Sequence, residues 1–434
     1  MRSGAVGTIP WLGLWLVAAC VSSCGTDRAA NGPGAGAVSD ATSTTAGGSP
    51  GTGGAAGGTT AATGGAAGTS RAGDASSAGG NAAGGATLDS GSTGQPSSDG
   101  SVSDAGQPPV IAAGVRWVGR VDTTDAAGPR FGWSGTGFVA RFTGTSLTAR
   151  LNNGGAFVFK AVVDGAPQPA FATTAGQGSY GLASGLPAGT HDVALYRQTE
   201  GFYGDSQLLG LTVGGGTLVD PPAAPARLIE VVGASVSCGF GDLGASPCTF
   251  TFGTESHWDT YESVAARALG AEVSTVAISG RGVYRNADGT TDGTMPKLFD
   301  RILAGSAAPT WDFRTTPQVV VINLGKNDLA LGDPGTIFRD GYLAFTRTLR
   351  GRYPNAFIVC TTGPNLGEPG HTQQLGYVSA VVATRHTEGD SAIELLDWPE
   401  QVAGQIGCEA HPNAVKQASM GEQLTALLRA RLQW

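Results

Sequence analysis

The second half of the chain alternates short apolar runs with longer stretches in which apolar residues recur every three or four positions. The apolar runs lie at residues 228–232, 273–278, 318–324, 356–361 and 392–396. Each run has the length and β-branched content of a buried strand, and the stretches between them have helical spacing. One helix is expected from Pro412 to about Leu432. Strands alternating with helices predict an α/β domain over residues 226–434, with a parallel sheet covered on both faces.

Residues 109–222 follow a different pattern, in which apolar and polar positions alternate within short segments. Turns rich in Gly, Asn, Asp and Pro, such as 152–155, separate these segments. This period of two predicts an antiparallel β-sandwich, of jelly-roll type, before the α/β domain. The proline-rich segment 220–225 is expected to be a stiff linker between the two domains.

The N-terminal part has neither pattern. Residues 25–108 consist mostly of Gly, Ala, Ser and Thr, which bury too little apolar surface to fold, and we expect a disordered linker. Residues 1–24 have the charge and the short apolar core of an export signal. The small residues before Cys20 resemble a bacterial lipobox, so we expect a lipid on Cys20 and a lipoprotein of the cell envelope, periplasmic or at the surface. Cys24 is a second candidate, and cleavage that releases a secreted product is the alternative.

Composition narrows the partners and the redox state. The formal net charge is −8 and no basic cluster is visible, which gives the chain no electrostatic reason to bind nucleic acid. Export would place the remaining cysteines in an oxidising compartment. Four cysteines allow three pairings, of which we expect Cys238–Cys248 and Cys360–Cys408.

Four polar or glycine-bearing turns follow the predicted strands of the α/β domain. They are 233–241, 278–282, 323–328 and 408–413. The C-terminal ends of parallel strands share one edge of a sheet, so these turns are expected to converge. Ser235 is the predicted nucleophile, and His411 is the predicted base that takes its proton. The backbone N–H groups of Ser235 and Gly280 and the side-chain amide of Asn327 are expected to stabilise an oxyanion, with Gly282 as a competitor of Gly280.

These turns together resemble the SGNH (GDSL-type) hydrolase superfamily, whose Ser, Gly, Asn and His occur in this order. The closer resemblance is to carbohydrate esterase family 2. It is carried by segments 232–241, 254–255, 261–267, 279–283, 323–328 and 407–413, and it extends over about residues 110–434. The resemblance implies an N-terminal β-sandwich, no cofactor, and removal of acetyl groups from plant polysaccharides such as acetylated xylan or glucomannan.

Two positions depart from the superfamily pattern. Ala234 stands where the motif has aspartate, and Cys408 stands where many members have an aspartate three residues before the histidine. Glu409 is therefore the expected side chain to orient the imidazole of His411. If Glu409 points away, a backbone carbonyl must orient the ring, which leaves a Ser–His dyad.

Other polar and aromatic residues were weighed as ligands. His257, His371 and His386 fit no metal spacing, and segment 286–293 lacks the closing Glu of a calcium loop, so no metal is expected. Trp398 follows the last strand and is the expected platform for a sugar ring.

The sequence thus predicts a serine acetylesterase acting on polysaccharide. A general carboxylesterase or lipase on the same fold is one alternative. A catalytically weak carbohydrate-binding surface protein is another, motivated by Ala234 and Cys408.

Overall fold

The computed structural model describes residues 114–434. The predicted export signal, the lipid attachment site Cys20 and the predicted linker lie outside the described residues. Among residues 114–434, no helix has both the length and the apolar character needed to cross a membrane.

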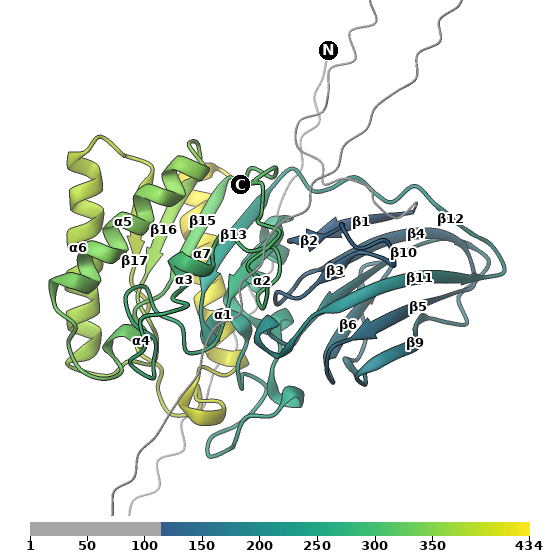
Figure 1. The fold of residues 1–434 in the computed structure, drawn as a ribbon, viewed down its shortest axis with the longest axis horizontal. Coiled ribbons are helices and arrows are strands. Elements are labelled where there is room, and N and C mark those ends of the chain that lie inside the picture. The colour runs from purple at the N-terminus through teal and green to yellow at the C-terminus, as the bar shows by residue number, and fades with distance from the viewer. Residues whose placement is uncertain (1–113) are drawn as a thin grey trace, which may run out of the picture. The chain divides into compact units, whose positions relative to one another are not determined.

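The first part of the described chain forms two antiparallel sheets, as the alternating pattern predicted (Figure 1). One sheet has the strand order β1-β4-β10-β6-β7, with β12 paired to β4 and β8 paired to β6. Its strands are β1 Val115–Val118, β4 Gly137–Gly144, β6 Val158–Val163, β7 Ala166–Pro167, β8 Phe171–Ala172, β10 Gly189–Arg197 and β12 Thr217–Val219. The other sheet has the order β2-β3-β11-β5-β9. Its strands are β2 Val121–Asp122, β3 Arg130–Phe131, β5 Ser146–Asn153, β9 Gly176–Ala183 and β11 Ser206–Gly214.

Alternation along the strands builds the core of this sandwich. In β5, Leu147, Ala149 and Leu151 are fully buried, whereas the polar residues between them remain partly or wholly exposed. Successive side chains of a strand point to opposite faces, so one face of β5 enters the core and the other faces solvent. Phe138, Phe142 and other buried aromatic side chains from the first sheet complete the same core.

The second part is a five-stranded, wholly parallel sheet with the order β14-β13-β15-β16-β17, as predicted. Its strands are β13 Leu228–Gly233, β14 Glu272–Ala277, β15 Val319–Asn323, β16 Phe357–Thr361 and β17 Ile393–Leu396. The α-helices are α1 Ser235–Cys238, α2 Tyr261–Leu269, α3 Met295–Leu298, α4 Lys326–Leu329, α5 Thr336–Arg352, α6 Gly370–Thr387 and α7 Ala414–Leu432. Short 3₁₀ helices are η1 Gly201–Tyr203, η2 Phe252–Thr254, η3 His257–Asp259 and η4 Cys408–Ala410.

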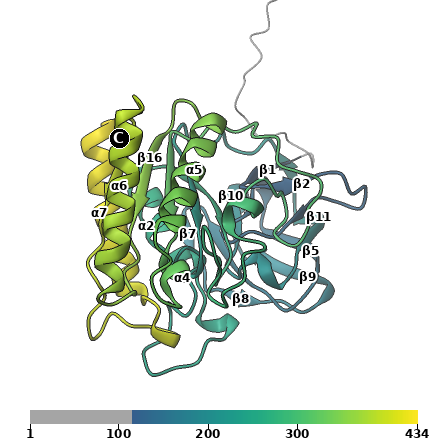
Figure 2. The same ribbon diagram turned by 60° about the vertical axis from the view of Figure 1, so that its left-hand side comes forward.

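Helices cover both faces of the parallel sheet (Figure 2). On one face, Ile229 and Val231 of β13 pack with buried residues of α2 and α7. On the other face, Val232 packs with buried residues of α5 and α6. Because β13 lies between β14 and β15, the turns that follow these three strands emerge next to one another.

The sandwich and the parallel sheet meet in a buried seam and belong to one compact unit. Arg120, in the β1–β2 turn, is 1% exposed and donates from Nη2 to Glu230 Oε1 of β13 over 2.8 Å. The hydroxyl of Tyr353 donates to the same carboxylate over 2.9 Å. Trp133 of the sandwich donates from its indole nitrogen to the carbonyl of Ile302 over 2.8 Å. The two parts are therefore joined by buried polar contacts as well as by the linker.

The predicted disulfide pairing is wrong. The structure joins Cys248 to Cys408, whereas Cys238 and Cys360 are buried free thiols. Cys360 lies inside β16, and Cys238 faces the sandwich from α1, so neither can reach the loop cysteine expected for it. The loop that carries Cys248 folds back on the histidine turn, where the Cys408 N–H donates to the carbonyl of Gly241 over 3.0 Å.

The predicted exposure of Trp398 is also wrong. Its side chain is fully buried and packs edge-on against Tyr261 of α2, with 4.6 Å between ring centroids. The apolar contacts of the sheet face with α2 and α7 draw this indole into the core, so it offers no platform to a sugar.

Candidate active site

Ser235 lies at the first position of α1, directly beyond the end of β13. Gly233 is the last residue of the strand, and a Cβ there would clash with the hydroxyl of Ser237, so the missing side chain lets the first turn of the helix pack close to the strand end. Ser235 is 8% exposed, so its hydroxyl lies at the floor of a depression rather than fully in solvent.

The structure brings His411 to Ser235. His411 Nε2 lies 2.9 Å from Ser235 Oγ, and His411 Nδ1 lies 3.1 Å from the backbone carbonyl oxygen of Glu409. A carbonyl only accepts hydrogen bonds, so Nδ1 carries the proton and Nε2 is left to accept from the serine hydroxyl. This is the arrangement that a serine nucleophile and its base require.

The side chain of Glu409 does not orient the imidazole, so that prediction is wrong and the backbone alternative holds. Glu409 adopts a left-handed conformation, with φ 51° and ψ 41°, which turns its carbonyl toward His411. Its carboxylate instead accepts a hydrogen bond from the N–H of Phe250 over 3.1 Å. The polar pair is thus a Ser–His dyad held by a main-chain carbonyl.

The imidazole is kept neutral by its surroundings. Desolvation and the nearby positive charge of Lys326 together lower the pKa of His411 to about 4, against contacts with Glu409 and Cys408 that raise it. The helix that follows begins at Ala414, with Asn413 as its cap, rather than at Pro412 as the sequence suggested. Desolvation and Lys326, more than a helix dipole, therefore hold the base in its proton-accepting form.

The predicted oxyanion donors lie on neighbouring turns. Asn327, on α4, donates one amide hydrogen to the carbonyl of Arg281 over 2.8 Å, which leaves its second hydrogen for a ligand. Gly282 donates its N–H to Asn286 Oδ1 over 3.3 Å, and a Cβ on it would clash with Arg285 and Asp328. Gly282 therefore serves loop packing, and Gly280 remains the candidate donor of this turn.

Asp328 supports the loop that carries Gly280. Its carboxylate accepts the N–H groups of Val283, Tyr284 and Arg285 over 2.9, 2.7 and 3.0 Å. The side chain that follows Asn327 along the chain thus fastens the 281–285 segment to α4.

A small cavity opens beside the nucleophile. Its walls include Ser235, Asn323, Asn327 and Asn365, and its volume is about 20 Å³. This is space for a group of one or two heavy atoms, since a single water needs roughly 10–15 Å³ by the same measure. A cavity of this size accommodates a short acyl group.

Aromatic rings extend from the base toward the surface, and we call them the aromatic strip. The strip consists of Phe240, Phe250, Phe252, Tyr203 and Phe202. Phe240 lies 4.5 Å from the His411 ring and 3.9 Å from Phe250, and Phe202 at the outer end is 59% exposed. Sequence reasoning missed the strip because two of its rings come from the sandwich and three from the loop after Ser235.

A parallel α/β sheet with a Ser–His pair at its edge defines a GDSL-like hydrolase domain, and the family models agree. The model described as GDSL-like Lipase/Acylhydrolase family matches residues 231–415. The model described as Carbohydrate esterase 2 N-terminal matches residues 117–222. A solved family two carbohydrate esterase from Clostridium thermocellum, in complex with cellohexaose, is 34% identical with a TM-score of 0.72, and the match covers 74% of this chain and all of that one. The chain belongs to carbohydrate esterase family 2.

Curated relatives agree with this family. Cellulase/esterase CelE of Acetivibrio thermocellus is 34% identical over 335 residues, but this chain spans only 41% of its length. An acetylxylan esterase / glucomannan deacetylase of Cellvibrio japonicus is 28% identical over 327 residues, which are 74% of this chain and 89% of that protein.

Proposed function

We propose that this protein is a serine esterase that removes acetyl groups from plant polysaccharides. The carrying observation is the 2.9 Å contact between Ser235 Oγ and His411 Nε2, with the opposite ring nitrogen fixed by a carbonyl. The curated relatives named as acetylxylan esterase / glucomannan deacetylase, and the cellohexaose complex of a family member, support acetylated xylan or glucomannan as the substrate class.

The geometry leads to a two-step acyl transfer. His411 Nε2 takes the proton of Ser235 while Oγ bonds to the acetyl carbonyl carbon, and the resulting oxyanion lies against the N–H groups of Ser235 and Gly280 and the amide of Asn327. The imidazolium then returns the proton to the sugar oxygen as the ester bond breaks. His411 then takes a proton from a water molecule whose oxygen bonds to the acetyl carbon. As the bond to Ser235 Oγ breaks and acetate leaves, the imidazolium returns the proton to Oγ and restores the hydroxyl.

The size of the cavity beside Ser235 favours an acetylesterase over a lipase. About 20 Å³ beside Ser235 accommodates the methyl of an acetyl group, whereas a fatty acyl chain needs an extended channel. The alternative of a catalytically weak carbohydrate-binding protein loses one of its two motives, because a main-chain carbonyl takes the place of the aspartate that is absent at Cys408, whereas Ala234 remains a departure from the motif.

The test compares acetate release from acetylated xylan and acetylated glucomannan by the full chain and by Ser235→Ala. Loss of the nucleophile is expected to lower the rate by about 10³-fold or more, because the acyl-enzyme cannot form. Ser237→Ala is the matched control, since Ser237 is buried two residues away and bonds to Tyr261 rather than to His411. Equal release by the parent and Ser235→Ala would remove Ser235 as the nucleophile, and polysaccharide binding without release by either would favour a binding protein.

We also propose that the chain is exported and carries a lipid on Cys20. The small residues before Cys20 support this proposal. Labelled fatty acid is expected to enter the parent and Cys24→Ala but not Cys20→Ala when these are expressed in a bacterium that processes lipoproteins. Labelling that follows Cys24 instead would move the attachment site, and no labelling of the parent would favour a secreted product.

A further inference from the structure

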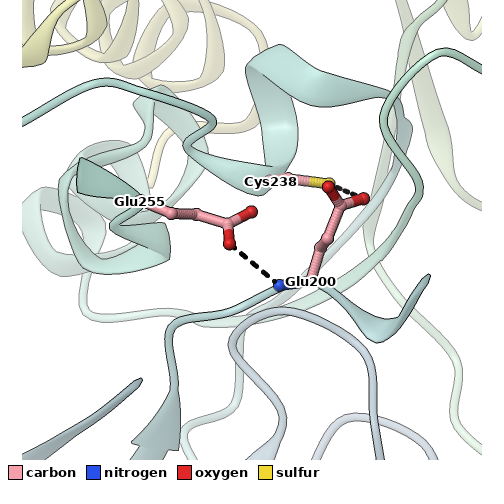
Figure 3. Close-up of side chains that lie close together, drawn as sticks. All are labelled: Glu200, Cys238 and Glu255. Atoms are coloured by element: carbon pink, nitrogen blue, oxygen red, sulfur yellow. Dashed lines mark hydrogen bonds between the residues drawn. The ribbon is translucent and has the colours of Figure 1, made fainter. Parts of the chain in front are cut away.

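A buried glutamate of the sandwich contacts both backbone turns of the proposed oxyanion hole. Glu200 lies between β10 and η1 and is 1% exposed. Its Oε2 accepts the N–H of Ser279 over 2.7 Å. Figure 3 shows the same carboxylate beside the thiol sulfur of Cys238, which lies 3.6 Å from Oε2. Ser279 directly precedes Gly280, and Cys238 ends the helix that begins at Ser235. One carboxylate oxygen therefore links the two segments that carry the proposed backbone donors.

Glu200 is itself held in place by its neighbours. Its backbone N–H donates to Glu255 Oε2 over 3.3 Å. Arg197, fully buried at the end of β10, donates to the carbonyl of Glu200 over 3.1 Å and to that of Thr199 over 2.8 Å. The Arg197 guanidinium also lies over the ring of Phe157, 3.8 Å from its centroid. The backbone that carries the Glu200 carboxylate is thus held in place by buried side chains at the end of β10.

The local charges favour an anion at Glu200 rather than at Glu255. Burial raises the pKa of both carboxyls. The Ser279 N–H, the Cys238 thiol and Arg197 lower that of Glu200 but leave it above its usual range, whereas the pKa of Glu255 is raised more strongly. The pKa of Glu255 is raised further by the charge of Glu200. The positive charge of Arg197 and the N–H and S–H donors offset part of the cost of burying one carboxylate, whose shortest hydrogen bond is the one from Ser279.

We infer that Glu200 is a positioning residue of the esterase: it holds the Ser279–Gly280 turn so that the Gly280 N–H points at the oxyanion beside that of Ser235. The inference rests on the proposed function and extends it, because a residue of the sandwich then sets the geometry of a hole built by the hydrolase domain. An oxyanion donor acts only when it is aimed at the developing charge, and a small displacement removes much of its effect.

The variants separate the reach of this side chain from its charge. Glu200→Gln keeps an acceptor oxygen at the same reach and removes the charge, whereas Glu200→Asp keeps the charge and is one methylene shorter. Glu200→Asp and Glu200→Ala are expected to lower kcat for p-nitrophenyl acetate by about 10- to 100-fold with KM within about twofold, somewhat less than deletion of an oxyanion donor. Glu200→Gln is expected to restore most of kcat. The inhibition constant of methylboronic acid, which forms a tetrahedral adduct on serine, is expected to weaken in parallel with kcat.

Glu230→Ala is the matched control. Glu230 is an equally buried glutamate of the same seam, but it bonds to Arg120 and Tyr353 and not to the oxyanion turn. It is expected to lower the melting temperature while leaving kcat of the folded enzyme within about twofold. Equal loss of kcat in Glu230→Ala and Glu200→Asp would reduce Glu200 to a general stabiliser of the seam and overturn the inference. An active Glu200→Asp with an inactive Glu200→Gln would do the same, by showing that charge and not the bond matters.

Two further readouts complete the test. The rate at which a fluorophosphonate probe labels Ser235 measures the function of the oxyanion hole without a polysaccharide substrate. If the parent is labelled but releases no acetate from polysaccharide, the substrate assignment fails while the positioning role of Glu200 can still be tested. Parent protein that neither reacts with the probe nor cleaves p-nitrophenyl acetate would overturn both proposals.

Glu200, Cys238 and Glu255 also place their ligand atoms within 4.8 Å of one another. Activity that EDTA abolishes and Zn²⁺ restores would assign Glu200 to a metal and overturn the positioning role.

Discussion

At the scale of single residues, the protonation state of His411 decides whether Ser235 can act as a nucleophile. Ser235 is inert at neutral pH unless a neutral base accepts its proton. The carbonyl of Glu409 fixes the tautomer of that base, while burial and Lys326 lower its pKa to about 4. The dyad therefore needs no carboxylate to remain ready over the whole neutral range.

This environment predicts an unusually low acid limit of activity. Below its pKa the imidazole is protonated and cannot accept from Ser235, so kcat/KM is expected to stay level from pH 7 to about pH 5 and to fall tenfold per unit below about pH 4. Lys326→Gln removes a repulsive cation and should move this limit to higher pH. A pH–rate profile with p-nitrophenyl acetate measures both.

The exposed Lys297 provides the control, because it pairs with Asp292 and is not among the charges that shift the pKa of His411. Lys297→Gln is expected to leave the profile unchanged. An acid limit near pH 6.5 in the parent would contradict a half-buried histidine whose pKa is lowered by desolvation and by Lys326.

At the scale of elements, the loop between α1 and α2 is fastened to the histidine turn η4. The disulfide Cys248–Cys408 joins them, and two hydrogen bonds of 3.1 Å link Glu409 with Cys248 and Phe250. Three contacts within a few residues restrain this loop strongly, and they hold Phe250 against Phe240 beside the base. The aromatic strip is thus fixed relative to the dyad.

The aromatic strip, which extends from the base toward the surface, is expected to lower KM for a polysaccharide substrate but not for a small ester. Phe250→Ala is expected to raise KM for acetylated xylan by about 5- to 10-fold, because an aromatic contact contributes about 1 kcal/mol. It should change kcat/KM for p-nitrophenyl acetate by less than threefold, since that substrate needs only the dyad and the acyl cavity.

Phe171→Ala is the control for this comparison, since Phe171 packs against Tyr180 in the sandwich and not against His411. It should leave both substrates unaffected. A Phe250→Ala variant that loses both activities equally would show that the ring supports His411 rather than the sugar.

At the scale of the whole described molecule, the sandwich and the hydrolase domain form one compact unit. Arg120 and Glu230 are both 1% exposed, and their pairing crosses the seam with the help of Tyr353. Buried charges are tolerated only when each is compensated, so the seam fixes one relative placement of the two parts.

Breaking this pair predicts a large loss of stability. Arg120→Ala leaves Glu230 charged and unpaired in the interior, which costs about 3–5 kcal/mol. For a chain of this size we expect the melting temperature to fall by roughly 10 °C. Arg120→Met with Glu230→Leu should lose less, because neither charge is then buried.

Calorimetry or circular dichroism of the melting transition measures this difference. Arg339→Ala, which breaks only an exposed pair with Asp340, is the control and should change the melting temperature by about 1 °C or less. A melting temperature unaffected by Arg120→Ala would show that the seam contributes little to folding.

The sequence by itself determined the two sheet types, because the spacing of apolar residues is a local property that follows the geometry of strand and helix. It also indicated which turns meet at one edge of the sheet, since the C-terminal ends of parallel strands share an edge, and the structure brings Ser235, Asn327 and His411 of these turns together. Gly280 was selected by its place in the family motif and stays a prediction. The tertiary structure alone decided which way individual groups point. Cys248 is bonded to Cys408 because its loop folds back on the histidine turn, and the side chain of Trp398 is buried in the core. Glu409 orients His411 with its backbone carbonyl and not with its carboxylate. Glu200 reaches the oxyanion turn from another domain. None of these side-chain and backbone orientations produces a periodic pattern in the sequence, because each depends on packing between segments that are distant along the chain.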